Sequence, residues 1–166
     1  SQRYNLEDGK TYILVANGIV SGSGYEPTVP FDIYVYDMGR ESASKNGNTD
    51  VLVFHGSTDA PTVDVVEIGA GAGTIVDDMF YGEFKGYLEL PTDDYILDIR
   101  DESGSNSVVS YAAPLASLDL NGAAAVVVAS GFLSPDNNNG GEAFGLWVAL
   151  PTGGDLVELP VFTPGN

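Results

Sequence analysis

Short apolar runs separated by Gly- and Pro-rich turns dominate the chain. The clearest pattern lies at residues 95–100, where the spacing places Tyr95, Leu97 and Ile99 on one face and the polar residues Asp98 and Arg100 on the other. Such alternation is typical of a β-strand that has one buried face and one solvated face. No window places apolar residues at helical spacing over three or more turns. The pattern therefore predicts an all-β protein.

The expected strands are short, evenly spaced and bounded by turn residues. Residues 51–55 are almost wholly apolar, so we expect them at the centre of a sheet. The Gly-rich run at 69–73 is expected to form a flexible turn. Further strands are expected at 12–17, 31–36, 63–65, 87–90, 95–100, 108–113, 123–130, 144–150 and 156–159. Strands of this length and spacing predict an immunoglobulin-like antiparallel β-sandwich.

An internal repeat relates the two ends of the chain. Placing Gly9 on Gly122 gives an offset of 113 residues (122 − 9 = 113), which aligns 9–35 with 122–148 without a gap. The offset superposes identical Val, Ala, Gly, Ser and Phe residues, with conservative apolar pairs between them. Chance is a poor explanation for so many matches, so the chain contains one structural unit and part of a second.

The repeat predicts the domain organisation. Residues 1–50 correspond to the second half of a preceding repeat and a linker, residues 51–160 to one complete repeat, and residues 161–166 to the start of a linker. A half sandwich cannot bury its own apolar face or pair its edge strands. We therefore expect the half-repeat to dock against the complete repeat, a neighbouring repeat or an identical chain, where strand exchange would give a dimer or filament.

The composition of the chain argues against several classes of binding partner and site. The chain has 24 Asp and Glu against 6 Lys and Arg, a formal net charge of −18, and this field repels nucleic acid and anionic membranes. The absence of cysteine excludes disulfides, thiolate catalysis and zinc-thiolate sites. No apolar run is long enough to span a bilayer. We therefore expect neither nucleic-acid binding nor membrane insertion, and an acidity suited to saline or extracellular conditions.

Four motifs resemble a known family. HGSTDAPTVDV at 55–65 is the most specific, and YGEFKGYLELP at 81–91, DYILDIRD at 94–101 and VVVASGFL at 126–133 accompany it. Together they resemble the bacterial secreted repeats grouped as domain of unknown function 4397. The resemblance implies an extracellular or cell-surface protein built of tandem immunoglobulin-like modules. That family has no established activity to carry over.

His55 is the only histidine, so a catalytic triad would have to use it together with Ser57 and Asp59. No nucleophile-elbow pattern surrounds any serine. The favoured interpretation is structural: Asp59 accepts local backbone hydrogen bonds in an Asx-type turn, Pro61 fixes φ, and His55 packs at the strand end.

Calcium is the one candidate cofactor. The loop at 134–142 places Asp136, Asn138 and Glu142 between glycines, and oxygen ligands of this kind bind Ca²⁺. The loop does not follow the EF-hand template, and a polar surface loop is the simpler interpretation. The adjacent pair Asp77 and Asp78 is expected to point to opposite faces of a strand.

Aromatic residues offer a further alternative. Tyr12, Tyr34, Tyr36 and Trp147 would form a sugar-stacking platform if they faced outward on one sheet, although alternating aromatics more often belong to a core. The sequence thus predicts a non-catalytic, extracellular structural or adhesive module whose partners are neighbouring repeats or identical chains. The alternative is a carbohydrate- or calcium-dependent binding module, with surface glycans as partners.

Overall fold

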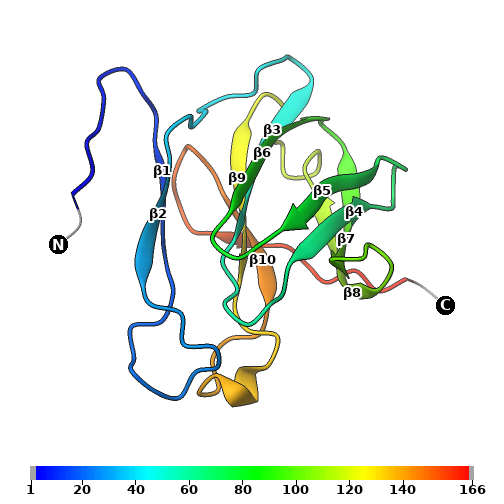
Figure 1. Ribbon diagram of the computed structural model, residues 1–166. Helices are drawn as coiled ribbons and strands as arrows, with labels where there is room; N and C mark the ends of the chain where they lie inside the picture. Colours follow the sequence, from blue (N-terminus) through cyan, green and yellow to red (C-terminus); the bar gives the residue numbers. More distant parts are fainter. Residues whose placement is uncertain (1–2, 165–166) are drawn as a thin grey trace.

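The protein is an all-β sandwich with an extra hairpin on one side (Figure 1). The computed structural model describes residues 3–164. One sheet has the order β11-β10-β9-β3-β6, the second has the order β5-β4-β7-β8, and β1 and β2 pair only with each other. The strands are β1 (Ile13–Asn17), β2 (Asp32–Tyr36), β3 (Asn48–His55), β4 (Val63–Glu67), β5 (Gly73–Met79), β6 (Phe84–Pro91), β7 (Asp94–Asp101), β8 (Ser107–Pro114), β9 (Ala124–Ser130), β10 (Gly145–Ala149) and β11 (Val157–Glu158).

The core lies between the two sheets and follows the period-two pattern. Val51 and Val53 of β3 point into it, together with Leu97 and Ile99 of β7 from the opposite sheet. The alternate residues of β3 include Phe54, which points to the outer face and is nevertheless fully buried. The five-stranded sheet is therefore covered on both faces at β3, which explains why residues 51–54 of this strand are all apolar.

One strand pair departs from a wholly antiparallel sandwich. β3 and β9 run parallel, from Asp50 opposite Ala124 to His55 opposite Ala129, whereas every other named strand pair of residues 3–164 is antiparallel. A parallel pair needs a long crossover, and here the crossover runs from β4 to β8 and supplies the whole second sheet together with β6. The period-two pattern of a strand does not indicate whether its neighbour runs parallel or antiparallel to it.

The β1–β2 hairpin has the same register as the β9–β10 hairpin. Ile13 lies opposite Tyr36, and their equivalents at the offset of 113, Val126 and Ala149, also lie opposite each other. The same holds for all five residue pairs of each hairpin. The sequence repeat is therefore matched strand for strand in the geometry of the two hairpins.

A glycine ends the first strand of each hairpin and lets the backbone approach the returning chain. Gly18 has φ +102° and its equivalent Gly131 has φ +84°. A Cβ atom would lie 2.5 Å from the carbonyl oxygen of Pro30 at the first position and 2.1 Å from that of Ala143 at the second. Only glycine combines this φ with such a close approach.

One strand differs from the sequence expectations. β5 begins in the Gly-rich run at 69–73, for which a turn is expected, and no strand is expected between that run and residue 87. At the end of the chain, Val161 bridges Tyr111 and the Phe162 amide donates to the Ser110 carbonyl at 2.8 Å, so residues 161–162 pair beside β8, and the start of a linker at residue 161 stays a prediction. Residues 165–166 of that segment lie outside the described residues.

Candidate functional site

The outer face of the five-stranded sheet is apolar, and the β1–β2 hairpin covers its β3–β6 side (Figure 1). The ring of Tyr34 packs on Phe54 at a centroid distance of 5.2 Å, and Tyr36 packs on Phe84 at 5.5 Å. Gly82 makes room for this contact, because a Cβ there would lie 2.6 Å from Cε1 of Tyr34. The half-repeat thus docks through aromatic stacking.

Polar contacts fix one end of this interface. The Asn17 side-chain amide donates to the Gly56 carbonyl at 2.8 Å and to the Tyr81 hydroxyl at 3.2 Å. Gly56 directly follows β3, so this contact ties the end of β1 to the end of β3. Burial raises the pKa of Tyr81, which therefore stays protonated at neutral pH.

An ion pair fixes the other end. Arg40, in the segment that leads from the hairpin to β3, contacts the Asp50 carboxylate, which is fully buried. The same guanidinium reaches Glu89 at 3.2 Å and lies 4.7 Å from the centre of the Tyr87 ring. Burying Asp50 without this partner would be costly, so Arg40 couples the hairpin segment to the stability of the sandwich.

A groove of about 630 Å³ lies beside the hairpin, on the part of the outer face that the hairpin does not cover. One wall is residues 12–17, and the other consists of outward side chains of β9 and β10, among them Val128 and Trp147. The four aromatic residues expected to form a platform therefore lie in two places. Tyr12 and Trp147 line this groove, whereas Tyr34 and Tyr36 pack between the hairpin and the sheet.

Asp59 is the centre of a hydrogen-bond network with the β9–β10 connection, which is the yellow-orange segment at the lower end of the molecule in Figure 1. Its carboxylate accepts the backbone amides of Leu133 at 2.9 Å and Ser134 at 2.8 Å, and the Asn138 side-chain amide at 3.1 Å. The expected Asx turn is therefore replaced by contacts to residues more than seventy positions away. Asp59 holds the β9–β10 connection against the turn after β3.

Asn138 has a structural role in the same hydrogen-bond network. It is fully buried; its side-chain oxygen accepts the Glu26 amide at 3.0 Å, and its side-chain nitrogen donates to Asp59 and to the Ser134 carbonyl at 2.9 Å. Asp136, in the short 3-10 turn Pro135–Asn137, and Glu142 are both exposed. The candidate calcium ligands thus include one residue whose amide is already engaged on both sides, and calcium binding by this loop stays a prediction.

His55 and Ser57 are both buried and face different partners. The Nε2 atom of His55 lies 3.0 Å from the Pro61 carbonyl, while its Nδ1 atom has no hydrogen-bond partner. Burial lowers the pKa of this imidazole. The Ser57 hydroxyl donates to the Gly131 carbonyl at 2.7 Å. Both side chains therefore connect neighbouring segments, as in the structural interpretation of this motif.

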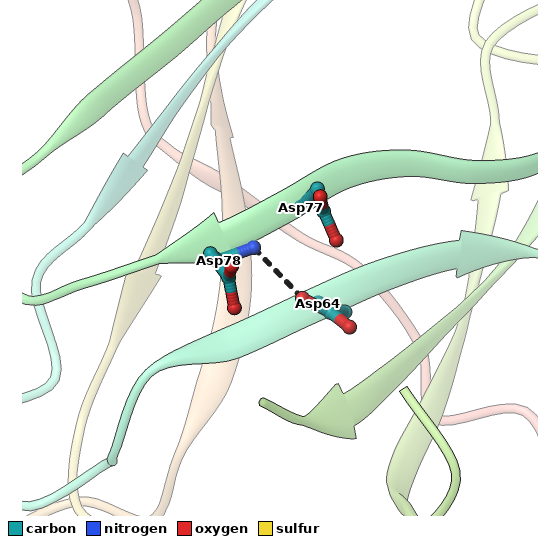
Figure 2. Close-up of side chains that lie close together, drawn as sticks. All are labelled: Asp64, Asp77 and Asp78. Atoms are coloured by element: carbon teal, nitrogen blue, oxygen red, sulfur yellow. Dashed lines mark hydrogen bonds between the residues drawn. The ribbon is translucent and has the colours of Figure 1, made fainter. Parts of the chain in front are cut away.

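Three aspartates come together where β4 pairs with β5 (Figure 2). A carboxylate oxygen of each of Asp64, Asp77 and Asp78 lies within 4.8 Å of the others. Asp64 is buried and accepts the Asp78 amide at 2.8 Å, while the other two are exposed. The expectation that Asp77 and Asp78 point to opposite faces is wrong, because the β4–β5 register shifts here and Asp78 has φ +49°.

The Gly-rich turn after β4 surrounds a carboxylate of its own chain. Glu67 is 2% exposed and accepts the backbone amides of Gly69, Ala70, Ala72 and Ile96 at 2.7 to 3.2 Å. Burial opposes ionisation, but these hydrogen bonds outweigh it and lower the pKa of Glu67. The turn therefore stabilises β4 against β7.

Fold and surface together define a class: a two-sheet β-sandwich with an outer sheet face that is partly covered by a hairpin of the same chain. A family model described as "Domain of unknown function (DUF4397)" matches residues 49–137, more than half of the chain. The chain belongs to this family. No curated protein and no solved structure matches it. Within residues 3–164, no helix has the length and apolar character needed to cross a membrane.

Proposed function

We propose that this chain is a non-catalytic structural or adhesive module of a secreted or cell-surface repeat protein, and that repeats join through the outer faces of their five-stranded sheets. The observation that carries the proposal is the β1–β2 hairpin. It has the register of β9–β10 and packs its outward residues on the outward residues of β3 and β6. Extracellular location rests on the acidic composition and the family resemblance.

Removing the hairpin tests this proposal. The chain 49–166 would expose Phe54 and the apolar residues around it, so we expect a lower melting temperature than for 1–166. We also expect 49–166 to self-associate as its concentration rises, which light scattering measures. Equal melting temperatures and a monomeric 49–166 would contradict the proposal.

A carbohydrate-binding function is the second candidate, because Trp147 and Tyr12 line an open groove and aromatic faces stack on sugars. Glycan-array binding that Trp147→Ala abolishes, and that Phe80→Ala leaves intact, would favour it. Phe80 is the matched control because it is 58% exposed and lies outside the groove.

A further inference from the structure

β1 lacks a neighbour that its equivalent strand has. β9 pairs with β10 on one side and with β3 on the other, whereas β1 pairs with β2 alone among the strands of residues 3–164. At the offset of 113, β2 corresponds to β10. The vacant side of β1 therefore corresponds to the side of β9 on which β3 runs. A strand edge of this kind accepts a further strand by backbone hydrogen bonding.

The groove lies on this vacant side. Its lining includes the whole of β1 and no residue of β2, and its second wall is formed by Val126, Val128 and Trp147 of the outer sheet face. A strand added to β1 would thus lie over β9 and β10, in the way that β2 lies over β3 and β6.

The hairpin also exposes a face that is core in the complete repeat. Leu14 is 50% exposed, whereas its equivalent Val127 is 5% exposed and belongs to the core. Ile33 and Val35 are half-buried, whereas their equivalents Leu146 and Val148 are core residues that are 3% and 1% exposed. The hairpin therefore carries the apolar face of a sandwich whose other half is not supplied by residues 3–164.

The docked hairpin indicates how the missing strand would sit. Tyr34, which is the equivalent of Trp147, contacts Phe54 on β3. If two repeats face each other through equivalent surfaces, the reciprocal contact joins Trp147 to the residue equivalent to Phe54 in the added strand. Trp147 lines the groove from the correct side for this contact.

We propose that the groove seats a β3-like strand from the first half of a preceding repeat, running parallel to β1 with its Val53 equivalent opposite Leu14. This register transfers the observed pair Val53–Val127 by the offset of 113. The proposal rests on the proposed function and adds the identity of the neighbour and its alignment.

Chemistry favours this occupant over the alternatives. The groove walls are mostly apolar, with Asn17, Arg40 and Ser130 as polar exceptions, and the edge of β1 offers backbone hydrogen bonds that an added strand satisfies. A second folded copy cannot supply β3, because β6 and β9 already occupy both of its edges. The first half of a repeat without its own β9 has such an edge free.

The test is an extended chain in which a copy of residues 49–113 precedes Ser1. Ser1 aligns with Pro114 at the offset (1 + 113 = 114), so the junction keeps the repeat in phase. Trp147 is the only tryptophan and the added segment contains none, so its fluorescence reports on the groove alone. We expect emission to shift to shorter wavelength, acrylamide quenching to fall, and the chain to remain monomeric.

Phe54→Ala in the added copy alone should abolish the shift, whereas Phe80→Ala in that copy should leave it unchanged. Unchanged Trp147 emission in a folded extended chain overturns the proposal, as does dimerisation in place of the shift or binding of a glycan in the extended chain's groove. If the added copy does not fold, a peptide of residues 48–56 titrated into 1–166 must shift Trp147 emission where a scrambled peptide does not; no shift overturns the proposal. Deletion of the hairpin tests the proposed function separately, since it involves no added segment.

Discussion

The ring of Tyr34 lies 5.2 Å from that of Phe54, at an interplanar angle of 55°, and this pair joins the half-repeat to the first strand of the complete repeat. Tyr34 also meets Tyr81 edge-on at 6.0 Å. Tyr34→Ala removes both contacts from a partly buried site, so we expect a loss of about 2 kcal/mol in the free energy of unfolding. Urea denaturation measures it.

Phe80→Ala is the matched control for this prediction, because Phe80 is 58% exposed. We expect a change within about 0.5 kcal/mol. Limited proteolysis should cut the Tyr34→Ala chain faster between β2 and β3 than the control chain. Equal rates would show that the aromatic pair does not hold the hairpin.

The pair Arg40 and Asp50 gives a second prediction for the same interface. Arg40→Met leaves a fully buried carboxylate without its cation, although the Ser44 backbone amide still donates a hydrogen bond to it. We expect a destabilisation of about 3 kcal/mol, part of which Asp50→Asn in the same chain should restore. Lys45→Met, at an exposed ion pair with Glu89, should cost about 0.5 kcal/mol or less. Similar losses for Arg40→Met and Lys45→Met would contradict this.

Asp59 gives a prediction about the β9–β10 connection. Asp59→Ala leaves the amides of Leu133 and Ser134 without their acceptor, so we expect a loss of about 3 kcal/mol and faster hydrogen exchange at these two amides. Asp136→Ala, at an exposed position of the same connection, should change neither quantity. Unchanged hydrogen exchange at both amides in Asp59→Ala would show that the hydrogen bonds to Asp59 do not order this loop.

Glu67 gives a prediction about pH. Its folded pKa lies below the unfolded value because backbone amides stabilise the carboxylate. The contribution is therefore fully present above the unfolded pKa, about 4.3, and is lost as pH falls through the lower folded pKa. We expect Glu67→Gln to lower the free energy of unfolding by about 2 kcal/mol at pH 7. The substitution should also make the free energy of unfolding fall less steeply as the pH is lowered. An unchanged fall at acidic pH would contradict this role of Glu67.

The three clustered aspartates give a prediction about charge. Like charges at this distance repel, and none of the ion pairs among the described residues involves them. Asp77→Asn should therefore stabilise the chain by a few tenths of a kcal/mol at low ionic strength, and this gain should shrink as salt rises. Millimolar Ca²⁺ should raise the melting temperature of the natural chain more than that of Asp77→Asn. Equal responses would place any calcium effect elsewhere, including at Asp136 and Glu142.

Local periodicity was sufficient to predict most strands, because a strand with one buried face has apolar residues at every second position, as at Tyr95, Leu97 and Ile99. This pattern predicts the sandwich class, and the offset of 113 predicts that the two hairpins are alike. β5 could not be predicted because two apolar residues, Ile75-Val76, are followed by two acidic residues, Asp77-Asp78, and this order breaks the alternation of apolar and polar positions. The register of β5 against β4 also shifts twice.

The candidate site was harder to predict, since its contacts are long-range. Asp59 binds amides 74 and 75 residues away, and no local motif encodes that distance. The three-aspartate cluster depends on the positive φ of Asp78, which strand periodicity does not report. The aromatic interface was visible only as residue types, because the packing of Tyr34 on Phe54 requires knowledge of which sheet face the hairpin covers.

The parallel pairing of β3 with β9 also has a kinetic consequence. Asp50 pairs with Ala124 at a sequence separation of 74 residues (124 − 50 = 74), so a chain that emerges from its N-terminus first must wait for most of the sandwich before β3 gains that neighbour. The β1–β2 hairpin is complete much earlier, and local hairpins form in microseconds. It can therefore shield Phe54 from aggregation during synthesis and so act as an internal chaperone for the sandwich that follows it.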